Sequence, residues 1–86
     1  MKVSIEITLA PLQTDYEAHI KAFIRSLRAS EFRTIENSLS THIYGEFLPL
    51  MEYLTSTIDT TFDALAAGMI HLKIVKTDRS EYQPFV

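Results

Sequence analysis

The chain has 86 residues, of which 47% are hydrophobic and 22% are charged, and its formal net charge is −3. A chain of this size and composition is expected to form one soluble globular domain, because it is too short to support two hydrophobic cores. Its eight Lys and Arg residues are scattered, so we expect no nucleic-acid partner, and the absence of cysteine excludes disulfides, thiol nucleophiles and cysteine-ligated zinc.

The first residues already follow a strand pattern, so we expect no secretory signal. No apolar run is long enough to span a bilayer, so we expect no membrane partner. Together with the lack of cysteine, these features predict a cytoplasmic protein.

The N-terminal segment alternates strictly between apolar and polar positions and ends at Pro11, which predicts a strand with one face on a core. Thr14 and Glu17 have the spacing of a capping box, so a helix should follow. Its apolar stripe is expected to consist of Tyr16, Ile20, Phe23, Ile24 and Leu27.

The segment 32–37 predicts a short edge strand, with a hairpin turn at 36–38. The stretch 38–46 then alternates like a half-buried strand. Its core side is expected to hold Leu39, Thr41 and Ile43, and its other side Ser40, His42 and Tyr44. Gly45 should either adopt a positive φ or allow a close approach to its backbone.

Pro49 fits the first turn of a second helix, and Gly68 fits the residue after its end. The expected core stripe of this helix is Met51, Leu54, Ile58, Phe62 and Leu65. A fourth strand should place Ile70, Leu72 and Ile74 on the core side and Met69, His71 and Lys73 on the other. Residues 1–77 would form the ligand-binding domain. Residues 78–86 would form a tail, containing Tyr82 and Phe85, that lies over a neighbouring subunit.

This order of elements predicts an α+β fold, the ferredoxin-like βαββαβ sandwich. Two helices would cover one face of a four-stranded antiparallel sheet of strand order 4-1-3-2, leaving the second face uncovered. The polar side of each strand would lie on that open face, which we expect to carry Ser4, Glu6, Thr8, Ser40, His42, Tyr44, Met69, His71 and Lys73.

The open face has few features typical of catalysis. Glu6 could lie between His71 and His42 if the register allowed, but this spacing is a weak metal signal and we predict no metal or other cofactor. Ser40 and His42 are about 6.6 Å apart between α-carbons on an ideal strand, too far for a direct nucleophile and base contact. We therefore expect no enzyme.

The segments 3–12, 16–27 and above all 38–46 resemble the YkoF-like thiamine or hydroxymethylpyrimidine-binding family, over about residues 3–75. The most specific piece is Ser40-Thr41 followed by Gly45-Glu46. The resemblance implies ferredoxin-like domains that pair, with Ser40 and Thr41 facing the ligand. This chain has one domain where the best-characterised type has two, so pairing would require a homodimer or homotetramer. It also has Phe47-Leu48-Pro49 where relatives place an acidic residue.

The open-face pattern adds Glu6, Thr8, His42 and Tyr44 to the predicted ligand site. We therefore predict non-catalytic binding of thiamine or its hydroxymethylpyrimidine moiety at a site formed with a partner subunit. Three alternatives stay open. They are a regulatory domain that senses small molecules such as amino acids, a cofactor-free oxygenase or isomerase with His42 or His71 as general base, and a domain that serves only assembly.

Overall fold

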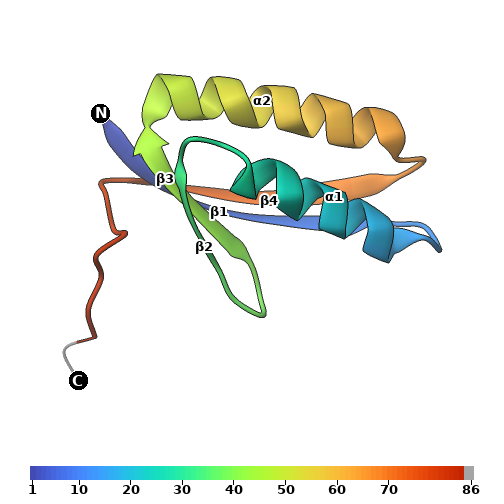
Figure 1. Cartoon of the computed structure of the whole chain (residues 1–86), viewed down its shortest axis with the longest axis horizontal. Helices are drawn as coiled ribbons and strands as arrows, with labels where there is room; N and C mark the ends of the chain where they lie inside the picture. The colour runs from blue at the N-terminus through green and yellow to red at the C-terminus, as the bar shows by residue number, and fades with distance from the viewer. Residues whose placement is uncertain (85–86) are drawn as a thin grey trace.

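The computed structural model describes residues 1–84, which form an antiparallel sheet with two helices on one face (Figure 1). The elements in chain order are β1 (Lys2–Pro11), α1 (Tyr16–Arg28), β2 (Arg33–Glu36), β3 (Thr41–Glu46), α2 (Phe47–Ala64) and β4 (Gly68–Lys76). The sheet order is β2-β3-β1-β4, which is the predicted order read from the other edge. The predicted ferredoxin-like α+β fold is therefore confirmed.

The core lies between the sheet and the two helices. Every second residue of β1 is buried there, as its alternation predicted. The buried apolar residues are Val3, Ile5, Ile7, Leu9, Phe23, Leu27, Ile43, Leu50 and Leu54. Because the helices cover only one side of the sheet, the alternate residues of β1 and β3 face away from this core.

The register of the central strand β1 decides which polar residues meet on the open face. Glu6 lies opposite His42 of β3 on one side and opposite Lys73 of β4 on the other. His71 lies opposite Thr8, two cross-strand pairs further along. The row of His71, Glu6 and His42, which the sequence left dependent on the register, therefore does not form.

The turn between β2 and β3 differs from its prediction at Leu39. The Asn37 Oδ1 accepts hydrogen bonds from the backbone N–H groups of Leu39 at 2.8 Å and Ser40 at 3.0 Å, which holds the chain in a side-chain-capped turn. The strand β3 consequently begins only at Thr41. Leu39 is 85% exposed at the tip of the hairpin, so its predicted core position is wrong.

The start of α1 and the end of α2 are formed by other contacts than those predicted. Helix α1 begins after Asp15, which makes no side-chain cap hydrogen bond, so the Thr14–Glu17 capping box does not form. Helix α2 ends at an extended Leu65 whose N–H donates to the Phe62 carbonyl, and Gly68 already belongs to β4 without a positive φ. The predicted C-terminal role of Gly68 is therefore wrong.

The inner face of α2 agrees with the predicted stripe in part. Leu54 is buried, and Met51, Ile58 and Leu65 pack against the core while partly exposed, whereas Phe62 is 44% exposed. The other buried positions of the helix, Leu50 and Thr57, were not predicted; with Leu54 they follow an i, i+4, i+7 spacing.

Gly45 follows the second of its two predicted alternatives. It has no positive φ, but a Cβ built on it would lie 2.6 Å from Cδ1 of Phe32. The Phe32 ring in turn packs edge-on against Tyr53, with ring centroids 6.0 Å apart. A side chain at position 45 would therefore displace an aromatic ring that links the hairpin to α2.

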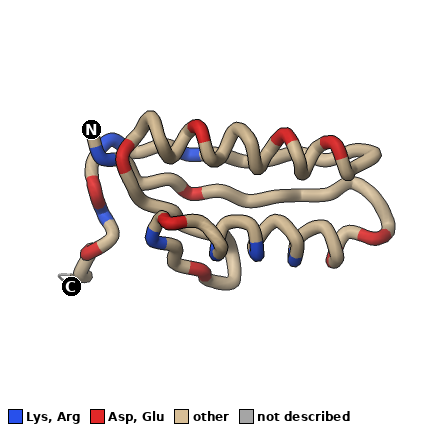
Figure 2. Tube along the Cα trace, turned by 45° about the horizontal axis from the view of Figure 1, so that its top comes forward, with Lys and Arg blue, Asp and Glu red and all other residues tan. Residues whose placement is uncertain are grey.

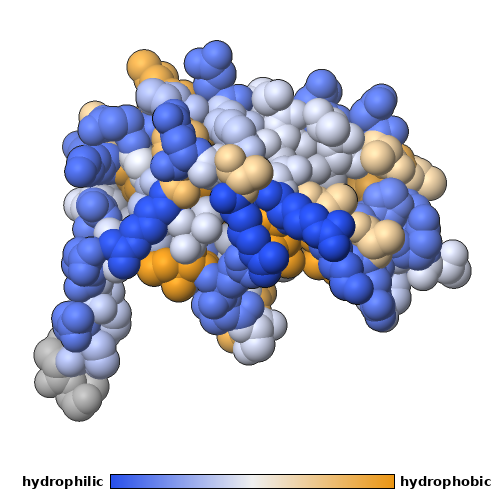
Figure 3. Space-filling view, viewed as in Figure 1, coloured by the Kyte–Doolittle hydropathy of each residue, from blue (hydrophilic) through white to orange (hydrophobic). Residues whose placement is uncertain are grey.

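Charged residues are distributed differently on the two helices. Figure 2 shows mostly Lys and Arg along α1, with Glu17 at its start, and only Asp and Glu along α2. On the side of the molecule seen in Figure 3, hydrophilic side chains lie in front and hydrophobic side chains appear as separate patches. No helix within residues 1–84 is long and apolar enough to cross a membrane.

Candidate functional site

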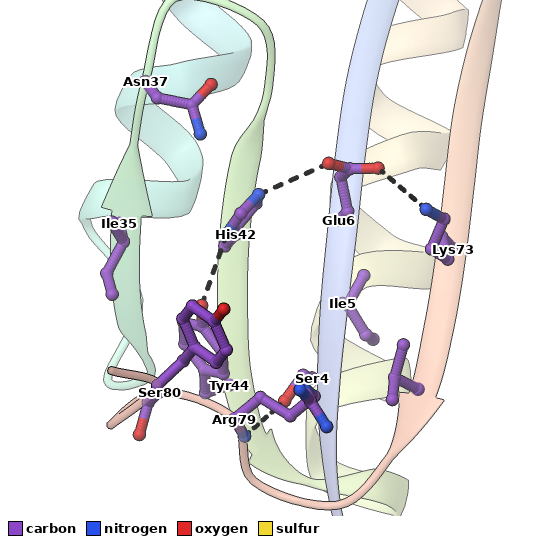
Figure 4. A pocket seen from close by; sticks show the side chains of 12 residues that line it. Ser4, Ile5, Glu6, Ile35, Asn37, His42, Tyr44, Lys73, Arg79 and Ser80 are labelled. Atoms are coloured by element: carbon purple, nitrogen blue, oxygen red, sulfur yellow. Dashed lines mark hydrogen bonds and ion pairs between the residues drawn. The ribbon is translucent and has the colours of Figure 1, made fainter. Parts of the chain in front are cut away.

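A cavity of about 590 Å³ lies on the face of the sheet that the helices leave uncovered (Figure 4). Its floor comes from all four strands, and one wall comes from the segment that follows β4. The lining residues are Ser4, Ile5, Glu6, Ile35, Asn37, His42, Tyr44, Lys73, Val75, Arg79, Ser80 and Tyr82. This volume is within the range of small-molecule sites.

Glu6 is the most highly connected polar side chain of this cavity. Its Oε2 accepts a hydrogen bond from the Ser40 hydroxyl at 3.0 Å and lies 3.4 Å from His42 Nε2. Its Oε1 lies 3.7 Å from Lys73 Nζ. Three neighbouring strand segments thus converge on one carboxylate, and the side chain keeps 43% of its surface exposed for a ligand.

These contacts hold Glu6 in its charged form. The Ser40 hydrogen bond is the largest cause that lowers the pKa of Glu6 below 4.5, and the charge of Lys73 and the contact with His42 lower it further. Partial desolvation acts in the opposite direction but is the smaller effect. The cavity therefore presents a carboxylate that accepts hydrogen bonds at neutral pH.

Tyr44 and His42 form an aromatic corner beside this carboxylate. Their rings are 6.5 Å apart at 80°, an edge-to-face arrangement, and the Tyr44 hydroxyl lies 3.3 Å from His42 Nδ1. Burial raises the pKa of Tyr44, so its phenol stays protonated. The corner offers a ring surface for stacking next to a charged acceptor.

The wall formed by the segment after β4 was not predicted as part of the site. The Ser4 hydroxyl donates to the Thr77 carbonyl at 2.8 Å and accepts from the Arg79 N–H at 2.8 Å, which ties this segment to β1. Further along, Arg33 of β2 forms an ion pair with Glu81. Strand alternation placed Ser4 on the open face, but it could not show that the chain returns over it.

Of the two aromatic residues of the predicted tail, the structure describes only Tyr82. Tyr82 lines the cavity, and its ring lies 5.8 Å from the Arg79 guanidinium carbon. Phe85 lies outside the described residues. The wall shows that residues 78–82 contact the sheet of their own chain, whereas the predicted contact with a neighbouring subunit stays a prediction.

The structure brings four of the six predicted site residues together: Glu6, Ser40, His42 and Tyr44. Ser40 reaches the site through its hydrogen bond to Glu6. Thr41 is 6% exposed and lies opposite Ile7 of the core side, so its side chain points away from the cavity. Thr8 lies on the open face opposite His71 but outside the cavity lining.

Metal binding has no support in this geometry. Within residues 1–84, no group of three or more His, Asp and Glu side chains is arranged to hold a metal ion. Lys73 occupies the position beside Glu6 that a second imidazole would need. An ammonium at this position competes with any cation for the carboxylate.

Comparisons with known proteins define the fold but not the family. The chain matches no protein-family model and no curated protein. A solved structure of the protein SP2199 from Streptococcus pneumoniae is similar with a TM-score of 0.83 and 25% identity, covering 91% of this chain and 89% of that one.

Two further solved structures share the fold. A candidate thiamine biosynthesis/salvage protein from Thermotoga maritima has a TM-score of 0.81 and 18% identity, with 90% of this chain and 85% of that one covered. A domain of unknown function, DUF77, from Bacillus cereus has a TM-score of 0.76 and 18% identity, with 90% and 77% covered. The fold of about nine-tenths of this chain is thus found in other solved structures.

The link between Ser40 and Glu6 predicts a measurable change in acidity. In Ser40→Ala the pKa of Glu6 should rise toward 4.5, because the largest cause of its lowering is removed. Carbon-detected NMR titration of the Glu6 carboxyl group measures this. Ser38→Ala, in the same turn, is the matched control and should leave the titration unchanged. An unaltered Glu6 titration in Ser40→Ala would contradict the hydrogen bond.

Proposed function

We propose that this protein binds thiamine or its hydroxymethylpyrimidine moiety without catalysis, as a cytoplasmic member of the YkoF-like group. The observation that carries the proposal is the Glu6 carboxylate, held charged by Ser40, His42 and Lys73 on the floor of an open cavity. An aminopyrimidine presents adjacent hydrogen-bond donors and acceptors. The Glu6 carboxylate can match the donors, and the neighbouring Lys73 ammonium can match an acceptor.

The aromatic corner supports the same class of ligand. A flat ring that donates to Glu6 would lie within reach of Tyr44, whose ring lines the same cavity. Each matched hydrogen bond contributes about 1 kcal/mol net, and stacking on a tyrosine adds about 0.5–1.5 kcal/mol. A few such contacts with ring burial reach micromolar affinity, roughly −8 kcal/mol.

The hydrogen-bonding pattern favours binding over hydrolysis. The Ser40 hydroxyl donates a hydrogen bond to the Glu6 carboxylate and not to His42. The imidazole of His42 is therefore not placed to activate Ser40 as a nucleophile. The two nitrogens of His42 lie near the Tyr44 hydroxyl and the Glu6 carboxylate. These contacts fix the ring as part of the wall of the site.

The similarity to solved structures supports the proposal at the level of its class. The Thermotoga maritima protein is described as a candidate for thiamine biosynthesis or salvage, and its fold is similar to this one over 85% of its length. The resemblance of residues 38–46 to thiamine-binding proteins points to the same class.

Calorimetric titration tests the proposal. Hydroxymethylpyrimidine or thiamine should bind the wild-type protein with a dissociation constant near the micromolar range. Glu6→Gln should weaken binding at least tenfold, because the amide loses the charge-assisted hydrogen bonds of the carboxylate. Glu52→Gln, an exposed change on α2, is the matched control and should bind like the wild type.

Two results would contradict this function. The first is the absence of heat and of thermal stabilisation at millimolar concentrations of both ligands. The second is stabilisation by amino acids and not by thiamine or its pyrimidine, which would favour the regulatory alternative. If wild type and Glu6→Gln bound these ligands with equal affinity, Glu6 would not contact the ligand.

We also propose that two copies pair along β4. The sheet order places β4 at an edge, so one side of this nine-residue strand has no backbone partner within residues 1–84. The strand exposes apolar side chains on both faces: Met69 is 46%, Leu72 is 39% and Ile74 is 44% exposed. Long apolar edges of this kind are favourable sites for pairing with another strand. Because Lys73 and Val75 of β4 line the cavity, a partner there would lie next to the ligand site.

Sedimentation velocity tests the pairing. The wild-type protein should sediment as a dimer or a larger even-numbered assembly, and Ile74→Lys should shift it toward the monomer, because a charge at the edge opposes strand pairing. Leu48→Lys changes a side chain that is 76% exposed on α2 and should leave the assembly intact. A wild-type monomer at high protein concentration would contradict the proposal.

A further inference from the structure

The wall of the cavity brings a cation to the site that the sequence pattern did not place there. Arg79 lines the cavity, and Figure 4 shows its side chain extending beside Ser4 over the floor of the sheet. Its backbone N–H donates to the Ser4 hydroxyl. The guanidinium therefore lies on the same face as Glu6, toward the end of the sheet where the chain turns back.

Among residues 1–84, no acidic side chain lies at ion-pair distance from this guanidinium. Its recorded contact is the face of the Tyr82 ring. The acidic groups of the wall have other partners: Glu81 pairs with Arg33, and the Asp78 carboxylate accepts from the Ser80 N–H. A guanidinium with unused donors in a ligand cavity is suited to an anionic group.

The position of Arg79 is fixed by a strained turn. Thr77 has a φ of 138°, a conformation that a β-branched residue rarely adopts. The turn is maintained by the hydrogen bond from Thr77 N–H to the Lys2 carbonyl and by the two bonds of the Ser4 hydroxyl, which is 8% exposed. Strain of this kind persists only where surrounding contacts determine the conformation, so the wall holds the backbone of Arg79 in place before a ligand arrives.

The cavity thus has an acceptor, Glu6, which is paired with Lys73, and a second cation, Arg79, toward the returning segment. Ser4 and Glu6 are two residues apart on β1, which corresponds to about 6.8 Å along a strand. One aromatic ring with a short ester link covers a separation of this order. A ligand that donates from its ring to Glu6 could therefore place an anionic group beside Arg79.

We infer that the cavity selects the phosphomonoester of its ligand, with Arg79 binding the phosphate while Glu6 binds the aminopyrimidine ring. The inference rests on the proposed function, since it takes the ring at Glu6 from there. It specifies the ligand further, as hydroxymethylpyrimidine phosphate or thiamine monophosphate in place of the unphosphorylated compounds. Both esters carry an aminopyrimidine and a phosphate. The short ester link of hydroxymethylpyrimidine phosphate matches the spacing of Ser4 and Glu6 directly, whereas in thiamine monophosphate the thiazolium ring lies between the pyrimidine and the phosphate.

Comparative calorimetry tests the inference. The probes are hydroxymethylpyrimidine, its monophosphate, thiamine, thiamine monophosphate and inorganic phosphate, each titrated into the wild-type protein. At least one ester should bind about tenfold or more tightly than its unphosphorylated parent. In Arg79→Gln the ratio of the two affinities should fall close to one. In Arg25→Gln, which removes the same charge from α1, the ratio should stay as in the wild type.

The outcomes separate this inference from the function on which it rests. Binding of the parent compounds without any gain from phosphate overturns the inference and leaves the proposed function standing. A gain that persists in Arg79→Gln also overturns it. Inorganic phosphate that binds as tightly as the esters overturns it by showing an anion patch independent of the ring. If none of the pyrimidine ligands binds, the proposed function itself is contradicted.

Discussion

The structure depends on the one-sided coverage of its sheet. Both helices pack on the same face, and the apolar side of β1 supplies four of the buried residues between them, namely Val3, Ile5, Ile7 and Leu9. Because strand residues alternate between faces, every residue between these four must lie on the open side. Glu6 is therefore displayed at the centre of the open face by the same pattern that builds the core.

The sequence predicted most of the fold because its signals are periodic and local. The alternation of β1, β3 and β4 and the apolar stripe of α1 identify the elements, and their order leaves few topologies. The sequence could not predict Leu39, because a side-chain-capped turn at Asn37 overrides the continued alternation. It also left Gly45 undecided, since its packing against Phe32 brings together two segments 13 residues apart in the chain (45 − 32).

The candidate site was predicted in part, and the missing part has a physical reason. Face alternation correctly grouped Glu6, His42 and Tyr44, because it needs no knowledge of register. It could not decide between His71 and Lys73 as the neighbour of Glu6, since that depends on how β4 is aligned with β1. Arg79 and Tyr82 were not predicted as site residues, because no local sequence pattern indicates that the chain turns back over the sheet at Thr77.

Three sources thus combine into one site. The central strand supplies the carboxylate, the neighbouring strands supply the groups that keep it charged, including Lys73, and the returning segment supplies a wall and a second cation, Arg79. This division explains why the cavity is polar at both ends although the domain as a whole is ordinary in composition and only mildly acidic.

The most direct test of this account is a map of the ligand site in solution. Amide and side-chain NMR signals of the labelled protein should be followed while hydroxymethylpyrimidine or its phosphate is added. The account predicts shifts concentrated at residues 4–6, 42–44 and 79–82, with little change along α1 and α2. Shifts confined to the helices, or to the exposed hairpin tip at Leu39, would contradict the claim that the open face of the sheet is the binding surface.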